Sequence, residues 1–170
     1  FLDLKVTYYS AEYVEALVQS EAQKNLWTQD EMDRYKYQLL KTLKLNECIV
    51  FHFEFDNAGS TMHMAPFDSF LTLWVGKKKL SPVDYDKRFN FALGGKRDCM
   101  VWFPRYDEKT DKPLLEKVLT VKLDILGGIS PITTNRQFLS FIWDVTKDNP
   151  QRLYQGKAAS RLELDRLIAR

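Results

Sequence analysis

The chain has 170 residues, a length typical of one domain of about 100–200 residues. Hydrophobic residues make up 45% and charged residues 28%, which is typical of a globular domain and excludes a disordered chain. The 25 basic and 23 acidic residues leave a formal net charge of +2, so we expect no nucleic-acid partner. No apolar run approaches the about 20 residues of a membrane helix, so we expect no transmembrane span in this chain.

Two amphipathic helices are predicted near the N-terminus, after a first strand at residues 2–9. Ser10 is placed to cap the first helix, and Thr28 with Glu31 has the spacing of a capping box at the start of the second. The apolar residues that recur at helical spacing are Val14, Leu17, Val18 and Ala22, then Met32, Tyr35, Leu39, Leu40 and Leu43.

The apolar period then changes from that of a helix to that of a strand. In residues 49–55 every second residue is Phe, and alternate side chains of a strand share one face. Residues 56–69 are predicted to form a loop, and Gly94–Gly95 a hairpin turn. The lysine run 77–79 indicates a solvated sheet edge. Further strands are predicted at residues 70–75, 88–93, 99–103, 119–125 and 138–145.

This order of elements predicts an α+β chain that is mostly β. Because no helix fits between consecutive strands, the order of elements argues against parallel crossovers, and we expect an antiparallel β-sandwich of about six to seven strands. We expect a single domain over residues 1–170. It has a helical part at 1–46, the sandwich at 47–150 and a C-terminal tail with a short helix at 151–170.

The two cysteines do not form a metal or redox motif. Cys48 and Cys99 lie 51 residues apart and neither belongs to a Cys-x-x-Cys pair, which excludes a zinc ribbon and a thioredoxin-like site. Two free buried thiols and one disulfide bond are both compatible with this spacing, and a disulfide implies an oxidising compartment.

Met62, His63 and Met64 form the candidate metal site. Thioether and imidazole ligands suit Cu(I), so the run is typical of a short copper-binding loop. The alternative is that the methionines fill gaps beneath neighbouring strands. The sequence carries no phosphate-cradling glycine loop and no His-Glu-x-x-His motif, so we expect no cofactor.

The second candidate site consists of Trp74, Trp102, Asp84 and Asp86. Both tryptophans fall opposite the aliphatic positions of their strands, where they are either core residues or a stacking platform for a sugar or a partner protein. A hydrolase would instead use two loop carboxylates, and the loops supply Asp84, Asp86, Asp107, Glu108 and Asp111.

Three segments carry a resemblance to a group of known proteins: 70–74, 101–104 and 119–123. In their pattern the chain resembles uncharacterised bacterial exported proteins, often lipoproteins, with a β-sandwich preceded by helices. The resemblance covers residues 30–150. It implies a location in the cell envelope or periplasm and a lipid anchor upstream of Phe1. The residue pattern itself leaves the compartment open, the cytoplasm included.

Three hypotheses of function follow from these observations. The first is a non-catalytic cell-envelope protein that serves as a structural module or binds another cell-envelope protein. The second is a small-ligand binder, for copper through Met62–Met64 or for a glycan through exposed aromatic residues. The third is a hydrolase that uses the loop carboxylates. The oligomeric state is not predicted.

Overall fold

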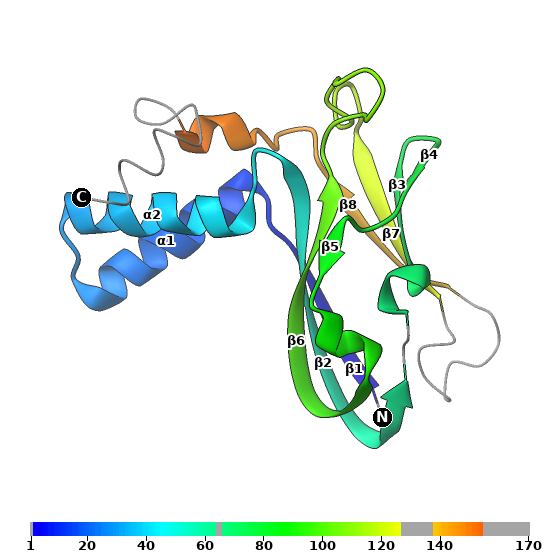
Figure 1. The fold of residues 1–170 in the computed structure, drawn as a ribbon. Coiled ribbons are helices and arrows are strands. Elements are labelled where there is room, and N and C mark those ends of the chain that lie inside the picture. The colour runs from blue at the N-terminus through cyan, green and yellow to red at the C-terminus, as the bar shows by residue number, and fades with distance from the viewer. Residues whose placement is uncertain (1, 64–65, 127–137, 155–170) are drawn as a thin grey trace. The chain divides into compact units, whose positions relative to one another are not determined.

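The computed structural model of the chain describes residues 2–63, 66–126 and 138–154. These ranges contain two α-helices and eight strands in two four-stranded antiparallel sheets, which confirms the α+β class with mostly strands (Figure 1). No helix among them is long and apolar enough to cross a membrane. The chain divides into two compact units, Phe1–Tyr8 with Ile49–Thr146, and Tyr9–Cys48 with Lys147–Arg170.

The second unit is built on two helices, α1 (Ala11–Asn25) and α2 (Gln29–Leu43), and both predicted caps are confirmed. The Ser10 hydroxyl accepts a hydrogen bond from the amide of Tyr13, and the Thr28 hydroxyl accepts one from the amide of Glu31. The Thr28 hydroxyl also donates to the Glu31 carboxylate at 3.2 Å. Each cap satisfies an amide that has no partner inside its helix.

A short 3-10 helix at Pro150–Tyr154 belongs to the same unit as the helices. Arg152 donates to the Glu15 carboxylate at 2.8 Å, and the amide of Ala11 donates to Asp148 at 2.9 Å. These bonds join two segments that lie 137 residues apart in the chain. The residues on which the predicted C-terminal helix rests, 162–168, lie outside the described residues.

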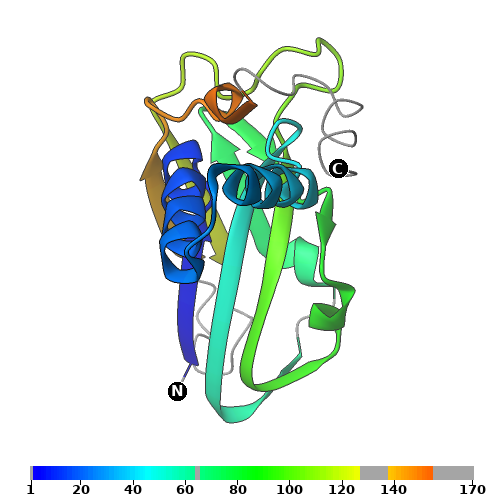
Figure 2. The same ribbon diagram turned by 90° about the vertical axis from the view of Figure 1, so that its left-hand side faces the viewer.

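The first sheet has the strand order β1-β2-β6-β5, with β1 (Leu2–Tyr8), β2 (Cys48–His63), β6 (Ala92–Pro104) and β5 (Asp84–Tyr85). Figure 2 shows β1, β2 and β6 side by side as long strands.

Two sequence predictions are wrong in this sheet. The predicted loop at 56–69 is strand up to His63, because β6 supplies partners along that polar stretch: the Asn57 side chain donates to the carbonyl of Leu93. The predicted hairpin at Gly94–Gly95 is absent, since β6 runs through both glycines. Gly95 has a φ of 67°, the left-handed value expected for a turn, and the strand continues past it. The predicted strand at 88–93 begins instead as a 3-10 turn, Lys87–Asn90.

The second sheet has the order β4-β3-β7-β8, with β4 (Lys78–Leu80), β3 (Leu71–Val75), β7 (Thr120–Leu126) and β8 (Phe138–Asp144). The predicted strands at 70–75, 119–125 and 138–145 are confirmed within about one residue at each end. The sequence missed β4 and β5, which have three and two residues, because such short strands show no measurable period.

Alternate side chains of the two sheets meet in one hydrophobic core. The Phe51 ring on β2 lies 5.0 Å from the Trp143 ring on β8, so the contact joins the two sheets. Phe53 and Phe67 meet edge to face at 6.0 Å. The fully buried side chains of this core include Phe51, Phe53, Phe67, Leu73, Val101, Phe103, Leu123 and Ile125.

Both cysteines are buried and neither takes part in a disulfide bond, so the disulfide alternative does not hold. Burial raises the pKa of the Cys99 thiol, and the nearby charges of Asp86 and Asp98 raise it further.

Replacing Phe53 by Ala is expected to lower the free energy of unfolding by about 3–5 kcal/mol, because it empties a fully buried aromatic position. Urea denaturation followed by circular dichroism measures the change. The matched control is Phe91→Ala. The Phe91 side chain is 70% exposed, and its loss should change the stability by less than about 0.5 kcal/mol. Equal losses in the two variants would contradict the position of the core.

Candidate functional site

Trp74 lies on β3 between two lysines, on the sheet face opposite the buried Leu73 and Val75. The strand register places Lys79 of β4 directly on one side of it and Lys122 of β7 directly on the other. Their ammonium nitrogens lie 5.6 and 5.8 Å from the centre of the Trp74 ring. Cations within about 6 Å of an aromatic centre are attracted by its π electrons, so both charges are held beside the indole.

The carboxylate of Asp124 fixes the orientation of that indole. The Trp74 Nε1–H donates to Asp124 at 3.0 Å, and the hydroxyl of Ser140 donates to the other carboxylate oxygen at 2.6 Å. Lys122 lies 3.7 Å from the same carboxylate. Asp124 is only 7% exposed, and a buried carboxylate needs such partners. The ring is therefore held in one position before any ligand arrives.

A cavity of about 260 Å³ opens beside the ring. Its lining consists of Trp74, Gly76, Thr120 and Lys122. Gly76 leaves one side open, since a methyl group built on it would meet nothing within 4 Å. The volume is below the about 300–1,000 Å³ of a pocket for a whole drug-sized molecule, so it suits one ring of a longer ligand.

The surroundings of the cavity combine positive charge with apolar surface. Two lysines face one carboxylate, which leaves an excess of one positive charge. Ile142 on β8 lies directly opposite Lys122 and is 66% exposed. Trp74, Lys79, Lys122 and Asp124, which we call the Trp74 face, can therefore bind a group with a flat apolar side and a negative charge, and Ile142 lies next to this face.

Trp102 and Asp84, which were predicted with Trp74, belong to the other sheet, and Asp86 directly follows that sheet's strand β5. Trp102 is half-buried on β6, where Asp84 of β5 pairs with it in the strand register. Asp84 accepts a hydrogen bond from the amide of Tyr85. Asp86 accepts bonds from the amide and guanidinium of Arg88, which hold the pKa of its carboxyl below the ordinary value. Trp102 and Asp84 thus share a sheet with each other and not with Trp74, and Asp86 follows β5 as the N-cap of the 3-10 turn.

The predicted copper loop lies largely outside what the structure describes. The backbone of Met62 and His63 forms the last two residues of β2. Their side chains, and all of Met64, lie outside what the structure describes. Among the described residues, no group of three or more His, Cys, Asp or Glu is placed to hold a metal ion.

A second hollow, of about 440 Å³, lies on the first sheet, and its lining mixes charges of both signs: Asp3, Lys5, Glu54, Asp56, Lys96, Arg97 and Asp98. Lys5 lies 3.7 Å from the Glu54 carboxylate across β1 and β2. His52 contacts Asp98 at 2.8 Å, and its other ring nitrogen is 3.8 Å from Glu54. The side chains in these ion pairs, except His52, are substantially exposed, so the arrangement is that of a solvated charged surface.

Asp107, one of the loop carboxylates considered for hydrolysis, serves the turn in which it lies. Asp107 accepts bonds from the amides of Lys109 and Thr110 and pairs with Lys78. The hydrogen bond from Lys78 is the main reason that the pKa of Asp107 is lowered to about 2. A carboxyl with so low a pKa does not supply the proton that a general acid must give at neutral pH.

Three residues of the Trp74 face were missed in the sequence: Lys79, Lys122 and Asp124. The alternation of residues 119–125 put Lys122 and Asp124 on one face, which was a usable signal. It did not show that β3 and β7 are neighbours, and that pairing brings both residues to Trp74.

Comparison with known proteins finds no family model, no curated protein and no solved structure that matches the chain. The site therefore has to be interpreted from its own geometry.

Replacing Lys78 by Met is expected to raise the pKa of Asp107 from about 2 towards its ordinary value of 3.8, since the main hydrogen-bond donor is lost. A depressed pKa means that this contact stabilises the fold above the ordinary pKa and is lost as the pH falls through about 2. Carboxyl-carbon NMR between pH 1.5 and 6 measures the titration. Asp86, whose partner is Arg88, is the internal control. An unchanged pKa at Asp107 would contradict the Lys78 contact.

Proposed function

We propose that this chain is a non-catalytic binding domain whose Trp74 face binds an anionic saccharide. The observation that carries the proposal is the indole of Trp74, oriented by Asp124 and flanked by Lys79 and Lys122. As part of the proposal, the two sheets form a β-sandwich around their common core, and their outer faces are open to ligands.

A saccharide suits this face because its ring has an apolar side formed by C–H groups. These groups carry a small positive charge and pack on the negative face of an indole. Neutral sugars need only that platform. The two lysines favour a sugar that also carries a carboxylate, since ammonium–carboxylate hydrogen bonds are stronger than neutral ones. The open side at Gly76 leaves room for the next unit of a chain.

A binding role is preferred to hydrolysis because Asp86 and Asp107 already accept hydrogen bonds from neighbouring residues. Asp86 is occupied by Arg88, and Asp107 by Lys78 and its own loop. The Trp74 face contributes a single carboxylate, Asp124, which already accepts bonds from Trp74 and Ser140. Glycoside hydrolysis ordinarily requires two carboxyl groups about 5–9.5 Å apart across the bond that is cleaved.

A partner protein is the second candidate for the same face. The observation that favours it is Ile142, which is 66% exposed beside Lys122 and adds apolar area that a sugar would not need. Aromatic and basic residues next to exposed aliphatic surface are common at protein interfaces. The cell-envelope location implied by the resemblance stays a proposal, and fractionation of the full-length protein in its host tests it.

The test is calorimetric titration with an oligogalacturonide and with a neutral maltooligosaccharide of equal length. We expect measurable affinity for the acidic oligomer and weaker affinity for the neutral one. Trp74→Ala should lower the affinity for the acidic oligomer by about tenfold or more, the equivalent of one lost ring contact. Lys122→Gln should lower it as well and reduce its dependence on salt.

Ile142→Ser is the matched control, because Ile142 is exposed beside Lys122 but does not line the cavity at the indole. Its affinity for the acidic oligomer should equal that of the unchanged protein. Loss of affinity for the acidic oligomer in Ile142→Ser but not in Trp74→Ala would contradict the placement of the saccharide on the Trp74 indole. Equal affinity for the neutral and acidic oligomers, or none for either, would overturn the proposal of an anionic saccharide.

A further inference from the structure

Phe91 presents an aromatic ring to solvent at the start of β6. Its side chain is 70% exposed, whereas Phe89, two residues earlier, is 2% exposed and belongs to the core. The amide of Phe91 donates to the carbonyl of Arg88 at 3.1 Å, which ends the 3-10 turn Lys87–Asn90. The turn thus buries one phenylalanine and directs the next outwards. The exposed ring is therefore accessible to a ligand.

A cavity of about 360 Å³ lies beside this ring. Its lining comes from the end of the 3-10 turn and the start of β6 (Arg88, Phe89, Phe91, Ala92 and Leu93) and from residues 96–98 further along β6. Its volume lies within the about 300–1,000 Å³ of small-molecule sites. The cavity lies beside β6, the strand that carries Trp102 in the first sheet. It is therefore separate from the Trp74 face, which lies on the second sheet.

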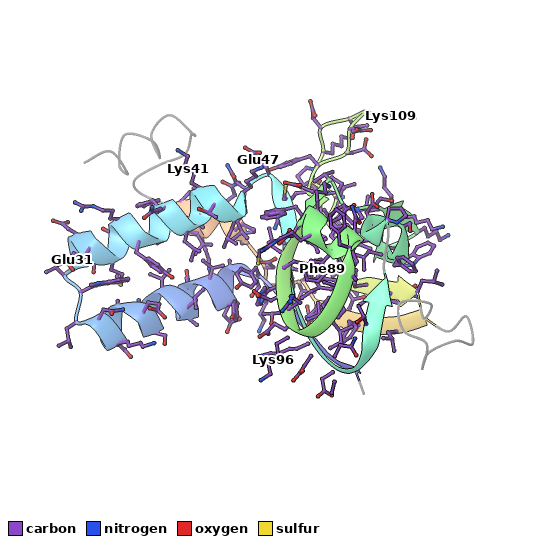
Figure 3. All side chains as sticks on the ribbon, turned by 60° about the horizontal axis from the view of Figure 1, so that its bottom comes forward. Glu31, Lys41, Glu47, Phe89, Lys96 and Lys109 are labelled. Atoms are coloured by element: carbon purple, nitrogen blue, oxygen red, sulfur yellow. The ribbon has the colours of Figure 1, made fainter. Side chains whose placement is uncertain are left out.

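The charges around this cavity do not cancel. The guanidinium of Arg88 is engaged by Asp86, with Nε 3.0 Å from one oxygen and Nη2 2.5 Å from the other. Asp98 is engaged by His52 at 2.8 Å. Lys96 and Arg97 are both exposed and neither makes an ion pair with a described residue. Figure 3 shows Lys96 at the periphery of the molecule, away from the buried Phe89.

We propose that this cavity binds a small aromatic anion, a molecule with a planar ring and a phosphate or carboxylate. The ring stacks on Phe91, and the anionic group is held by Lys96 and Arg97 through charge-assisted hydrogen bonds. A nucleoside monophosphate has this combination of ring and charge. A small ligand fits the observations better than a membrane surface, because the aromatic and basic groups border a hollow.

The probe is adenosine monophosphate, compared with adenosine and with inorganic phosphate by NMR chemical-shift titration. We expect adenosine monophosphate to bind more tightly than either part. Phe91→Ala should weaken it by about tenfold, as expected for one lost stacking contact. Arg97→Gln and Lys96→Gln should each lower the affinity for adenosine monophosphate. Neither should change the weak affinity for adenosine.

Lys109→Gln is the matched charge control, since Lys109 lies in a separate exposed loop (Figure 3). Trp74→Ala is the second control and tests independence from the saccharide site. Neither should change the affinity for adenosine monophosphate. Melting temperatures equal to that of the unchanged protein establish that the Phe91, Lys96 and Arg97 variants are folded.

Four outcomes would overturn the proposal. One is adenosine that binds as tightly as its monophosphate, because the cations would then contribute nothing. Another is an equal loss of affinity in Lys109→Gln, which would indicate general charge attraction. A third is no binding of adenosine monophosphate. The last is Phe91-dependent binding to phosphatidylserine vesicles without binding of the nucleotide, which would assign the surface to a membrane.

Discussion

The fold depends on the burial of the aromatic residues that alternate along β2. Phe51, Phe53 and Phe55 point from one strand into the core, and each is at most 2% exposed. Phe51 contacts Trp143 of the second sheet, while Phe55 and Phe67 both pack on Phe89. Burying one such side chain is worth about 1.5–3 kcal/mol, which is a large share of the about 5–15 kcal/mol that holds a domain folded.

This use of the inner faces determines where function can lie. A strand that gives one set of alternate side chains to the core has only the other set left for binding. On the second sheet that other set brings Trp74 between Lys79 and Lys122, with Asp124 beneath the indole nitrogen. On the first sheet the same alternation leaves a solvated row of His52, Glu54 and their charged partners. The two outer faces therefore differ in chemistry although the sheets share one core.

The ends of strands offer a second kind of surface. The 3-10 turn before β6 interrupts the alternation, so Phe89 faces the core and Phe91 faces solvent. In a continuous strand two residues separated by one would share a face. The alternation of residues 88–93 therefore predicts a strand with Phe89 and Phe91 on the same face, and this prediction is wrong. The exposed ring beside Lys96 and Arg97 exists because the strand starts later than the pattern indicates.

The amino-acid sequence by itself determined the local elements: the caps at Ser10 and Thr28, the two helices and the longer strands. Their signals are periodic or lie within four residues, where side chains and backbone interact directly. Only the tertiary structure decided which strands are neighbours, that β2 continues to His63, and that β6 passes through Gly94 and Gly95. It also separated Trp102 from Trp74 and brought Asp124 to Trp74, 50 residues away in the chain. Strand pairing is set by the packing of the whole core, and no short stretch of sequence contains that information.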